Sequence, residues 1–172
     1  MEEITMTFNR EAQYTANKIE IQKADASKIE EYKELFKNCS LYDHCFKKTD
    51  LLDQKLNEAI AQGRGFVAVD RDGATVGYAT IIPSDPLADG LPLIKLLAVK
   101  PDKRGRGIGQ MLLKFYEEVM AGIGYTECGL IVCDWNPRAR KLFDSLGYKL
   151  RKSFDDKVVG GYVDHLLIKK IG

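Results

Sequence analysis

Short apolar runs alternate along this chain with longer segments in which apolar residues recur every three or four positions. The runs predict β-strands and the longer segments predict amphipathic helices. Strands are expected at 18–23, 66–69, 75–82, 93–99, 127–133, 149–154 and 162–170. Helices are expected after Asp25 or Ser27, after Thr49 or Asp50, close to Gly107, and at Asn136. The order β-α-α-β-β-β-α-β-α-β-β predicts an α/β (α+β) fold, a mixed sheet covered by helices.

Local signals refine this outline. Ser27 and Glu30 have the spacing of a helix capping box. The Asp-Arg-Asp-Gly sequence at 70–73 predicts a hairpin turn. Residues 1–17 lack a sustained pattern, so we expect an N-terminal extension that is loosely packed or adds an edge strand, followed by one domain at 18–172. The segment 83–92 is expected to be a mobile loop.

Glycines and positive charges fill the junction between the apolar strand at 93–99 and the next helix. The sequence there is Lys103-Arg104-Gly105-Arg106-Gly107-Ile108-Gly109-Gln110. A helix that starts near Gly107 leaves its first amides unpaired, and glycines let a phosphate approach the backbone closely. This run therefore predicts a pyrophosphate site, although a glycine-rich turn between solvated arginines is the simpler alternative.

Two familiar phosphate-binding loops do not fit this spacing. The dinucleotide fingerprint would require glycine at Gln110. The nucleoside-triphosphate loop requires a Gly-Lys pair followed by Ser or Thr, and the sequence contains none. What fits is the pattern Arg/Gln-x-x-Gly-x-Gly/Ala, met by Arg104, Gly107 and Gly109.

With this pattern the chain resembles the GNAT superfamily of acyl-CoA-dependent N-acyltransferases. A second family signature, Asn-x-x-Ala-x-x-Leu-Tyr-x-x-x-Gly-Phe, is answered by Asn136, Ala139, Leu142, Phe143, Gly147 and Tyr148. The resemblance implies a central, mostly antiparallel sheet flanked by helices, and acetyl-CoA as co-substrate without a metal. It also implies a cofactor-binding set: Leu97, Val99, Arg104, Gly105, Arg106, Gly107, Ile108, Gly109, Gln110 and Asn136.

Within this set the expected roles differ. The resemblance assigns the main chain of Leu97 and Val99 to the pantetheine arm and the Leu97 amide to the thioester carbonyl, while both side chains also suit an ordinary core. Backbone amides at 104–110 suit the pyrophosphate, and nearby Lys and Arg side chains suit the outer phosphate. Asn136 before Pro137 fits a helix cap as well as a pantetheine contact.

The catalytic residues are not evident from the sequence. Relatives place Tyr where Phe143 stands, and its hydroxyl is thought to protonate the departing thiolate; Tyr148 and Cys133 are weak substitutes. Asp89, Asp134 and His44 are candidates for the base, and each is also explained as solvated loop charge. By the resemblance, the acceptor pocket lies between residues 41–44 and 154–157, where two aspartates could attract a cationic amine.

The expected function is that of an N-acetyltransferase that moves acetyl from acetyl-CoA to a primary amine of a small molecule or protein, by direct attack in a ternary complex. The alternative is a non-catalytic acyl-CoA-binding regulatory or sensor module, because Phe143 lacks the usual hydroxyl. A monomer or homodimer is expected.

Charge and cysteine content limit the partners, the location and the thiol chemistry expected of this protein. The chain has 26 Lys and Arg against 25 Asp and Glu, a net charge of +1, so neither nucleic acid nor an anionic membrane is an expected partner. The N-terminus has no apolar signal-like stretch, which predicts a cytoplasmic protein. The cysteines, Cys39, Cys45, Cys128 and Cys133, lack metal-ligand spacing and are expected to be free thiols.

Overall fold

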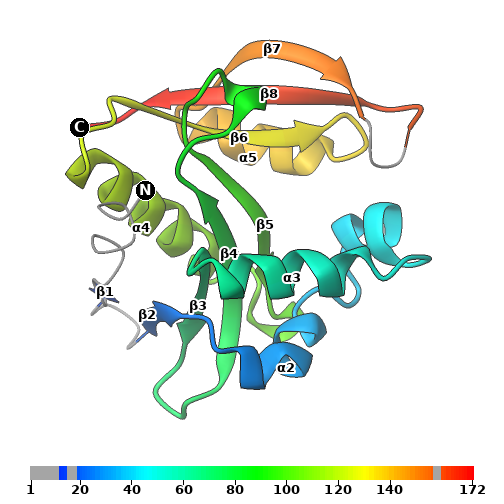
Figure 1. Ribbon diagram of the computed structural model, residues 1–172, viewed down its shortest axis with the longest axis vertical. Helices are drawn as coiled ribbons and strands as arrows, with labels where there is room; N and C mark the ends of the chain where they lie inside the picture. The colour runs from blue at the N-terminus through cyan, green and yellow to red at the C-terminus, as the bar shows by residue number, and fades with distance from the viewer. Residues whose placement is uncertain (1–11, 15–18, 157–159) are drawn as a thin grey trace.

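The computed structural model describes residues 12–14, 19–156 and 160–172 (Figure 1). Their strands form one sheet in the order β1-β2-β3-β4-β5-β6-β8-β7. The strands are β1 (Ala12–Tyr14), β2 (Ile19–Lys23), β3 (Gly65–Val69), β4 (Thr75–Ile82), β5 (Leu93–Val99), β6 (Glu127–Cys133), β7 (Lys149–Asp155) and β8 (Val163–Lys170). All neighbouring strands are antiparallel except β5 and β6, which are parallel.

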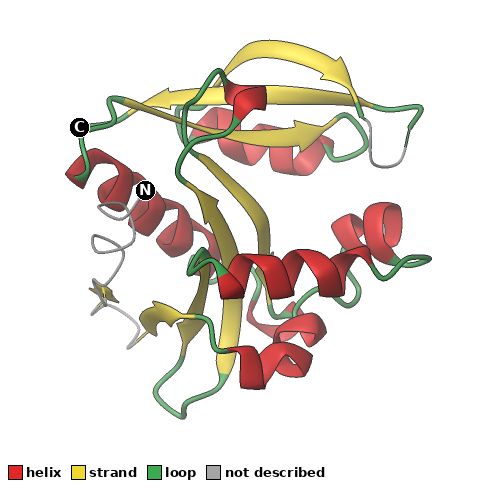
Figure 2. Cartoon of the chain, in the orientation of Figure 1, coloured by secondary structure: helices red, strands yellow, loops and turns green. Residues whose placement is uncertain are grey.

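In the described part of the chain, four α-helices flank the sheet (Figure 2). They are α2 (Ile29–Glu34), α3 (Leu51–Ala61), α4 (Ile108–Gly122) and α5 (Pro137–Ser145). Short helical segments also occur: η1 (Ala26–Lys28), η2 (Tyr42–Phe46), η3 (Pro86–Ala88) and η4 (Pro101–Lys103); η2 is a π-helix and the others are 3₁₀ turns. Counted over the described residues, the helices and strands keep the predicted order.

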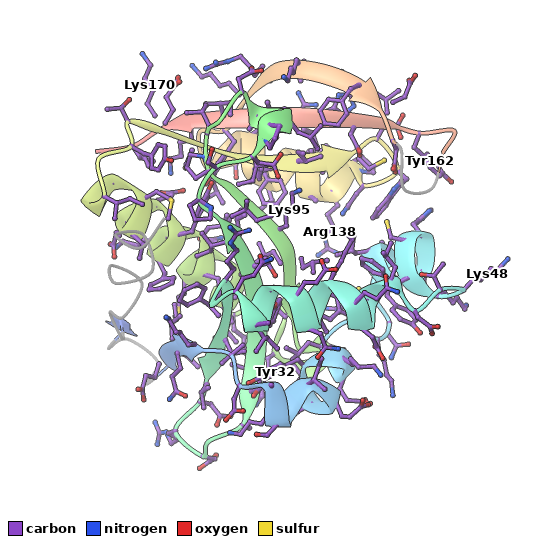
Figure 3. All side chains as sticks on the ribbon, viewed as in Figure 1. Tyr32, Lys48, Lys95, Arg138, Tyr162 and Lys170 are labelled. Carbon is purple, nitrogen blue, oxygen red and sulfur yellow. The ribbon has the colours of Figure 1, made fainter. Side chains whose placement is uncertain are left out.

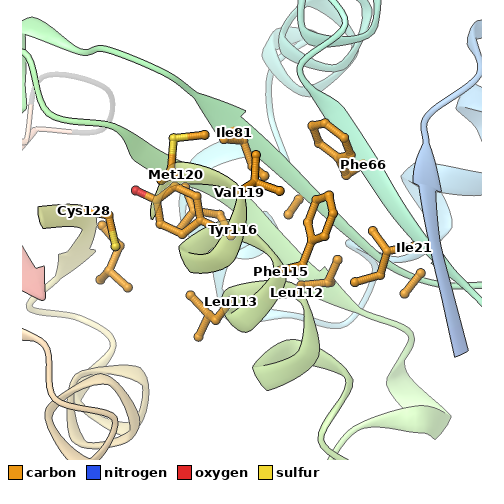
Figure 4. Close-up of a cluster of buried hydrophobic side chains, with 14 of the residues drawn as sticks. Ile21, Phe66, Ile81, Leu112, Leu113, Phe115, Tyr116, Val119, Met120 and Cys128 are labelled. Carbon is orange, nitrogen blue, oxygen red and sulfur yellow. The ribbon is translucent and has the colours of Figure 1, made fainter. Parts of the chain in front are cut away.

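Each face of the sheet has its own apolar core. The apolar stripe of α4 packs on one face, where the Phe66 and Phe115 rings lie 5.2 Å apart and Tyr116 is fully buried (Figure 4). On the other face, Tyr32, Phe36 and Leu56 from α2, its following turn and α3 pack on the strands. Because α4 and α3 lie on opposite faces, the sheet between them is shielded on both sides.

The sheet opens between its two parallel strands. β5 and β6 pair only at Leu93↔Gly129 and Ile94↔Leu130 and then diverge, so β6, β8 and β7 splay away from the other strands (Figure 1). A bulge accompanies the opening: the β4–β5 register shifts between Tyr78 and Thr80, and Leu96 has φ +52°. A bulge bends its strand and increases the local twist, which turns the end of β5 away from β6.

Tyr116 holds the closed end of this opening. Its hydroxyl oxygen lies 2.7 Å from the Pro92 carbonyl and 2.9 Å from the Gly129 carbonyl, and it accepts a hydrogen bond from the Gly129 N–H at 3.2 Å. Helix α4 thus carries one polar group into the core, at the last point where β5 and β6 touch. The burial of this hydroxyl raises the pKa of Tyr116 far above its usual range.

Most of the predicted boundaries are confirmed, and three local expectations need comment. Residues 12–14 pair with β2, which is the edge-strand alternative; residues 1–11 and 15–18 lie outside the described residues, and the division at residue 18 stays a prediction. The Ser27–Glu30 capping box is wrong: the Asp25 carboxylate accepts from the Ser27 N–H, because a 3₁₀ turn precedes α2.

The segment 83–92 is ordered, contrary to the prediction of a mobile loop. The buried Asp85 accepts a hydrogen bond from the Leu87 N–H at 2.8 Å and pairs with Lys95 at 3.0 Å. Its own N–H donates to the Leu91 carbonyl. The hydrogen bonds and the ion pair of Asp85 therefore hold together a segment that was expected to be mobile.

We expect Tyr116→Phe to destabilise the fold without changing its architecture. The variant removes a buried hydroxyl that contacts three backbone groups, and leaving these partly unsatisfied costs about 1–2 kcal/mol. Urea unfolding at equilibrium measures this free energy. Tyr125→Phe is the control, because the Tyr125 hydroxyl makes no hydrogen bond within the described residues, and an equal loss in both variants would contradict the assignment.

Candidate active site

The glycine-rich run forms the turn from β5 into α4. Gly105 and Gly107 have φ of +75° and +83°, values that side-chain-bearing residues rarely adopt, and a Cβ at either position would meet nothing within 4 Å. Gly107 is the N-cap, and the first helical hydrogen bond runs from the Met111 N–H to the Gly107 carbonyl. The amides of Ile108, Gly109 and Gln110 precede it. An open, positively polarised helix end therefore borders free space at this turn.

The three basic side chains of the run have different surroundings. Lys103 and Arg106 border a small hollow beside the 70–72 turn. The guanidinium of Arg104 is instead engaged: its Nε donates to the Val99 carbonyl and its Nη1 donates to the Asn38 carbonyl, both at 3.1 Å. Two backbone oxygens therefore hold the Arg104 guanidinium in place.

A cavity of about 590 Å³ occupies the opening between β5 and β6. Its walls come from segments that are far apart in the sequence: η2, α3, β4, β5, β6, the start of α5, and the β7–β8 hairpin. The lining includes Leu41, Cys45, Phe46, Lys55, Glu58, Thr80, Lys95, Leu97, Cys133, Trp135, Asn136, Phe143, Asp156 and Asp164. Figure 3 shows Lys95 between the sheet and α3, and Tyr162 beyond the end of β7.

The cofactor residues expected on β5 lie along this opening. Leu97 lines the cavity. The Lys100 N–H donates to the Val76 carbonyl at 2.9 Å, so in the antiparallel pattern the N–H and C=O of Val99 point away from β4, toward the opening. Cys133, at the end of β6, lines the same cavity from the opposite strand.

Both proposed roles of Asn136 remain compatible with its position. The Asn136 Oδ1 accepts a hydrogen bond from the Ala139 N–H at 3.3 Å, which caps α5, and the residue also lines the cavity. Phe143 lines the same cavity seven residues later. The Tyr148 hydroxyl instead donates to Glu117 Oε1 at 2.8 Å within the core, so it is unsuited to protonate a thiolate in the cavity.

Negative charge gathers on the β6–β8 side of the cavity. One ligand atom each from Cys133, Asp156 and Asp164 lies within 4.8 Å of the others, an arrangement that suits a single cation. Asp156 is only 6 % exposed, although its position at a hairpin suggested a solvated residue, and its neighbour Asp155 is exposed. Lys157 lies outside the described residues.

The ionisation of groups near this cluster reflects burial and mutual repulsion. Burial, followed by the charge of Asp156, raises the pKa of Asp164 above its ordinary value. Burial raises the pKa of Cys133 to about 12. Burial and the charges of Asp156 and Asp164 raise the pKa of Cys45 to about 11. The surroundings oppose further negative charge and favour a cation.

Aromatic rings close one side of the cavity. The ring of His44 on η2 stacks on Trp135 with centroids 4.2 Å apart, and the Tyr162 ring meets His44 edge-on at 5.7 Å. The Trp135 Nε1 is buried without a hydrogen-bond partner in the described part of the chain. The η2 segment is thereby attached to the start of α5.

None of the three residues predicted as candidates for the general base is among the residues that line the cavity. Asp89 is exposed and pairs with Lys152 at 3.0 Å, and Asp134 is exposed next to Cys133. His44 is exposed on its aromatic stack. Sequence reasoning missed Glu58 and Asp164, which do line the cavity; Asp164 was detectable only as the one acid in the otherwise apolar and basic strand β8.

Comparisons with known proteins agree with this architecture. The model of the Acetyltransferase (GNAT) family matches residues 29–148. A bovine thialysine N-epsilon-acetyltransferase is 45 % identical over 49 residues, which is 28 % of this chain and 29 % of that protein. The alignments thus cover under a third of the curated relatives' length.

Solved structures match over nearly the whole chain. A Thermoplasma acidophilum PaiA N-acetyltransferase in complex with coenzyme A has a TM-score of 0.66 at 20 % identity and covers 88 % of this chain and 98 % of its own. A spermidine N-acetyltransferase SpeG chimera of Vibrio cholerae and hSSAT has a TM-score of 0.67 at 14 % identity, covering 89 % and 95 %. These likenesses establish a shared fold.

None of the helices in the described ranges has the length and apolar character needed to cross a bilayer. The four cysteines are free thiols, as predicted. Cys39 and Cys45 are half-buried.

We expect the Cys45 thiol to react unusually slowly with iodoacetamide near neutral pH. A pKa of about 11 lowers the thiolate fraction on the order of a hundredfold below that of a free thiol. Peptide mass spectrometry after timed alkylation measures the rate, with glutathione as the reference. Asp164→Asn should accelerate the reaction by removing a repelling charge, whereas the exposed Asp155→Asn should not. Glutathione-like reactivity at Cys45 would contradict the described burial.

Proposed function

Because this chain belongs to the GNAT acetyltransferase family, we propose that it transfers acetyl from acetyl-CoA to a primary amine by direct attack within a ternary complex. The chain is an acyltransferase by family. The observation that carries the proposal is the continuity of two features: the open N-terminus of α4 lies beside the end of β5, and the cavity follows β5 between the splayed strands. A cytoplasmic monomer or homodimer remains our expectation.

The coenzyme is assigned to this path by its chemistry. The amides at 105–110 suit the pyrophosphate, and Lys103 and Arg106 offer charge for the outer phosphate. The pantetheine amides resemble a peptide, and the outward-facing N–H of Val99 offers them a donor at the strand edge, while the Val99 carbonyl accepts from Arg104. The Thermoplasma relative's complex with coenzyme A supports the same choice of ligand.

The acyl carbonyl is proposed to lie at Leu97. A backbone amide there would polarise the carbonyl and stabilise the tetrahedral intermediate, a contribution of about 3 kcal/mol for one well-placed donor. The amine then attacks from the β6 side, where Cys133 lines the cavity. The C–N bond forms, the C–S bond breaks, and the nitrogen gives up a proton.

The departing thiolate is proposed to leave without protonation by a side chain. Phe143 has no acidic proton, and the Tyr148 hydroxyl is bound to Glu117. Proton transfer from Cys133, with a pKa of about 12, to a coenzyme A thiolate with a pKa of about 8.5 is uphill. Water can supply that proton after the bond has broken.

The acceptor is proposed to be a small cationic amine. Asp156 and Asp164 place two carboxylates on the wall of the cavity, where a second ammonium group of a diamine-like acceptor would be stabilised. The bovine relative, a thialysine N-epsilon-acetyltransferase, is consistent with such an acceptor. Asp164 is the proposed proton acceptor, directly or through water, because its raised pKa favours proton uptake.

The non-catalytic sensor is distinguished from the enzyme by a pair of measurements. Calorimetry tests acetyl-CoA binding, and thiol release during incubation with diamines tests turnover. We expect acetyl-CoA to bind and thiol to be released. We also expect a diamine to be turned over faster than the amino alcohol in which a hydroxyl replaces one of its amines. Binding without thiol release across diamines, amino acids and peptides would favour the sensor, and no binding of acetyl-CoA at millimolar concentration would overturn the proposal.

We expect Gly107→Ala to weaken coenzyme A binding about tenfold or more. Alanine at φ +83° is strained and shifts the first amides of α4. Gly124→Ala is the matched control: it has φ +104°, equally open surroundings, and a position just beyond the other end of the same helix. Calorimetry should show unchanged affinity for this control, and equal losses in both variants would argue against an anion site at Gly107.

We expect Asp164→Asn to lower kcat/KM for a diamine about tenfold, because one carboxylate that stabilises the ammonium is lost. In the wild type the KM should rise as pH falls through the raised pKa of Asp164, since the protonated acid no longer attracts a cation. Asp164→Asn should lose this acidic limb. Steady-state kinetics in the presence of EDTA measures both, with Asp155→Asn as control; an unchanged acidic limb would remove Asp164 from the site.

A further inference from the structure

Arg104 connects two parts of the site. One is the turn at 103–110, here called the cofactor turn, and the other is the wall of the cavity formed by residues 39–46. It belongs to the glycine-rich run, yet its guanidinium spans two backbone carbonyls from distant parts of the chain. One is that of Val99, at the end of β5, and the other is that of Asn38, 66 residues earlier in the sequence. An exposed arginine that bonds two main-chain oxygens is positioned by them and is not simply solvated.

Asn38 stands where the chain turns toward the cavity. Its φ of +55° marks a left-handed turn after α2. The next residue, Cys39, makes several of the contacts that start η2: its carbonyl accepts from the Asp43 N–H at 3.1 Å, and its Sγ accepts from the Tyr42 N–H at 3.4 Å. The same thiol donates to the Phe36 carbonyl at 2.9 Å. The Asn38 carbonyl is therefore directly attached to the start of η2.

The η2 segment in turn builds one wall of the cavity. Leu41, Cys45 and Phe46 line it, and His44 stacks on Trp135 of the opposite wall. Contacts therefore run without a break from the cofactor turn through Arg104 to the residues facing the acceptor. The 42–46 segment is a π-helix, a rare conformation that is frequently found at functional sites.

We propose that Arg104 is a positioning residue: its bridge from Val99 to Asn38 holds the 39–46 wall of the acceptor pocket against the cofactor turn. In this proposal the coenzyme A phosphates are bound by the backbone amides at 105–110 and by Lys103 and Arg106, without the Arg104 side chain. The kinetic consequence rests on the proposed acetyl transfer, whereas the bridge itself is a property of the protein without substrates.

Hydrogen exchange tests the bridge independently of activity. Arg104→Lys keeps the charge but lacks the planar fork needed to reach both carbonyls. We expect amides at 39–46 to exchange about threefold to tenfold faster in this variant than in wild type, the range of one ordinary hydrogen bond. Asn38→Gly is the control, since glycine keeps both the turn and the carbonyl. Unchanged exchange at 39–46 in Arg104→Lys would overturn the proposal.

Kinetics separates positioning from phosphate binding. Arg104→Lys should raise the KM for the amine severalfold while the Kd for coenzyme A, measured by calorimetry, stays within about twofold of wild type. Arg106→Ala should show the reverse pattern. If Arg104→Lys instead weakens coenzyme A as Arg106→Ala does and leaves the amine KM unchanged, Arg104 binds phosphate and the proposal fails. If the wild type neither binds coenzyme A nor turns over an amine, the proposed function fails, and the exchange measurement alone decides the bridge.

Discussion

The divergence of β5 from β6 is the constraint on which the rest of this structure depends. Two parallel strands that paired along their full length would leave no room for a ligand and no unpaired backbone. In this protein β5 and β6 pair at two positions. Beside these pairs the Tyr116 hydroxyl contacts the carbonyl of Pro92, just before β5, and the carbonyl of Gly129 on β6. The bulge at Leu96 then turns β5 away, which opens the cavity and leaves the Val99 N–H facing it.

The site combines two regions with opposite electrostatic character. The open end of α4, with glycines and basic residues around it, favours an anion. The wall formed by Cys133, Asp156 and Asp164 favours a cation, and the thiols there have pKa values raised by burial and negative neighbours. A bound coenzyme and a cationic acceptor would thus meet from the two ends of one opening.

The family motif and the local chemistry differ at one position that matters for mechanism. Phe143 lines the cavity at the position where the family signature has a Tyr. The hydroxyl of Tyr148 in the same signature donates to Glu117 in the core, and Glu117 also accepts from Lys169. A thiol such as coenzyme A is a good leaving group near neutral pH without an acid catalyst. The loss of the hydroxyl is therefore compatible with catalysis, and proton removal from the amine becomes the step that needs a protein group.

The sequence by itself determined the features that are local. The strand at 93–99, the hairpin at 70–73 and the helix start at Gly107 each depend on residues within a few positions, so periodicity and glycine spacing predicted them correctly. The turn at 103–110, which we propose to bind the cofactor, could be predicted for the same reason, since its amides and glycines are consecutive.

Only the tertiary structure decided the acceptor side and the paths between segments. A charged residue in a hairpin is usually solvated, yet packing buries Asp156 beside Cys133 of β6 and Asp164 of β8. Arg104 stands in a basic, glycine-rich run, yet its guanidinium bonds the carbonyl of Asn38, which is far away in the sequence. No local pattern encodes such juxtapositions, because they arise from strand order and from the divergence of β5 and β6, which bring distant residues to one cavity.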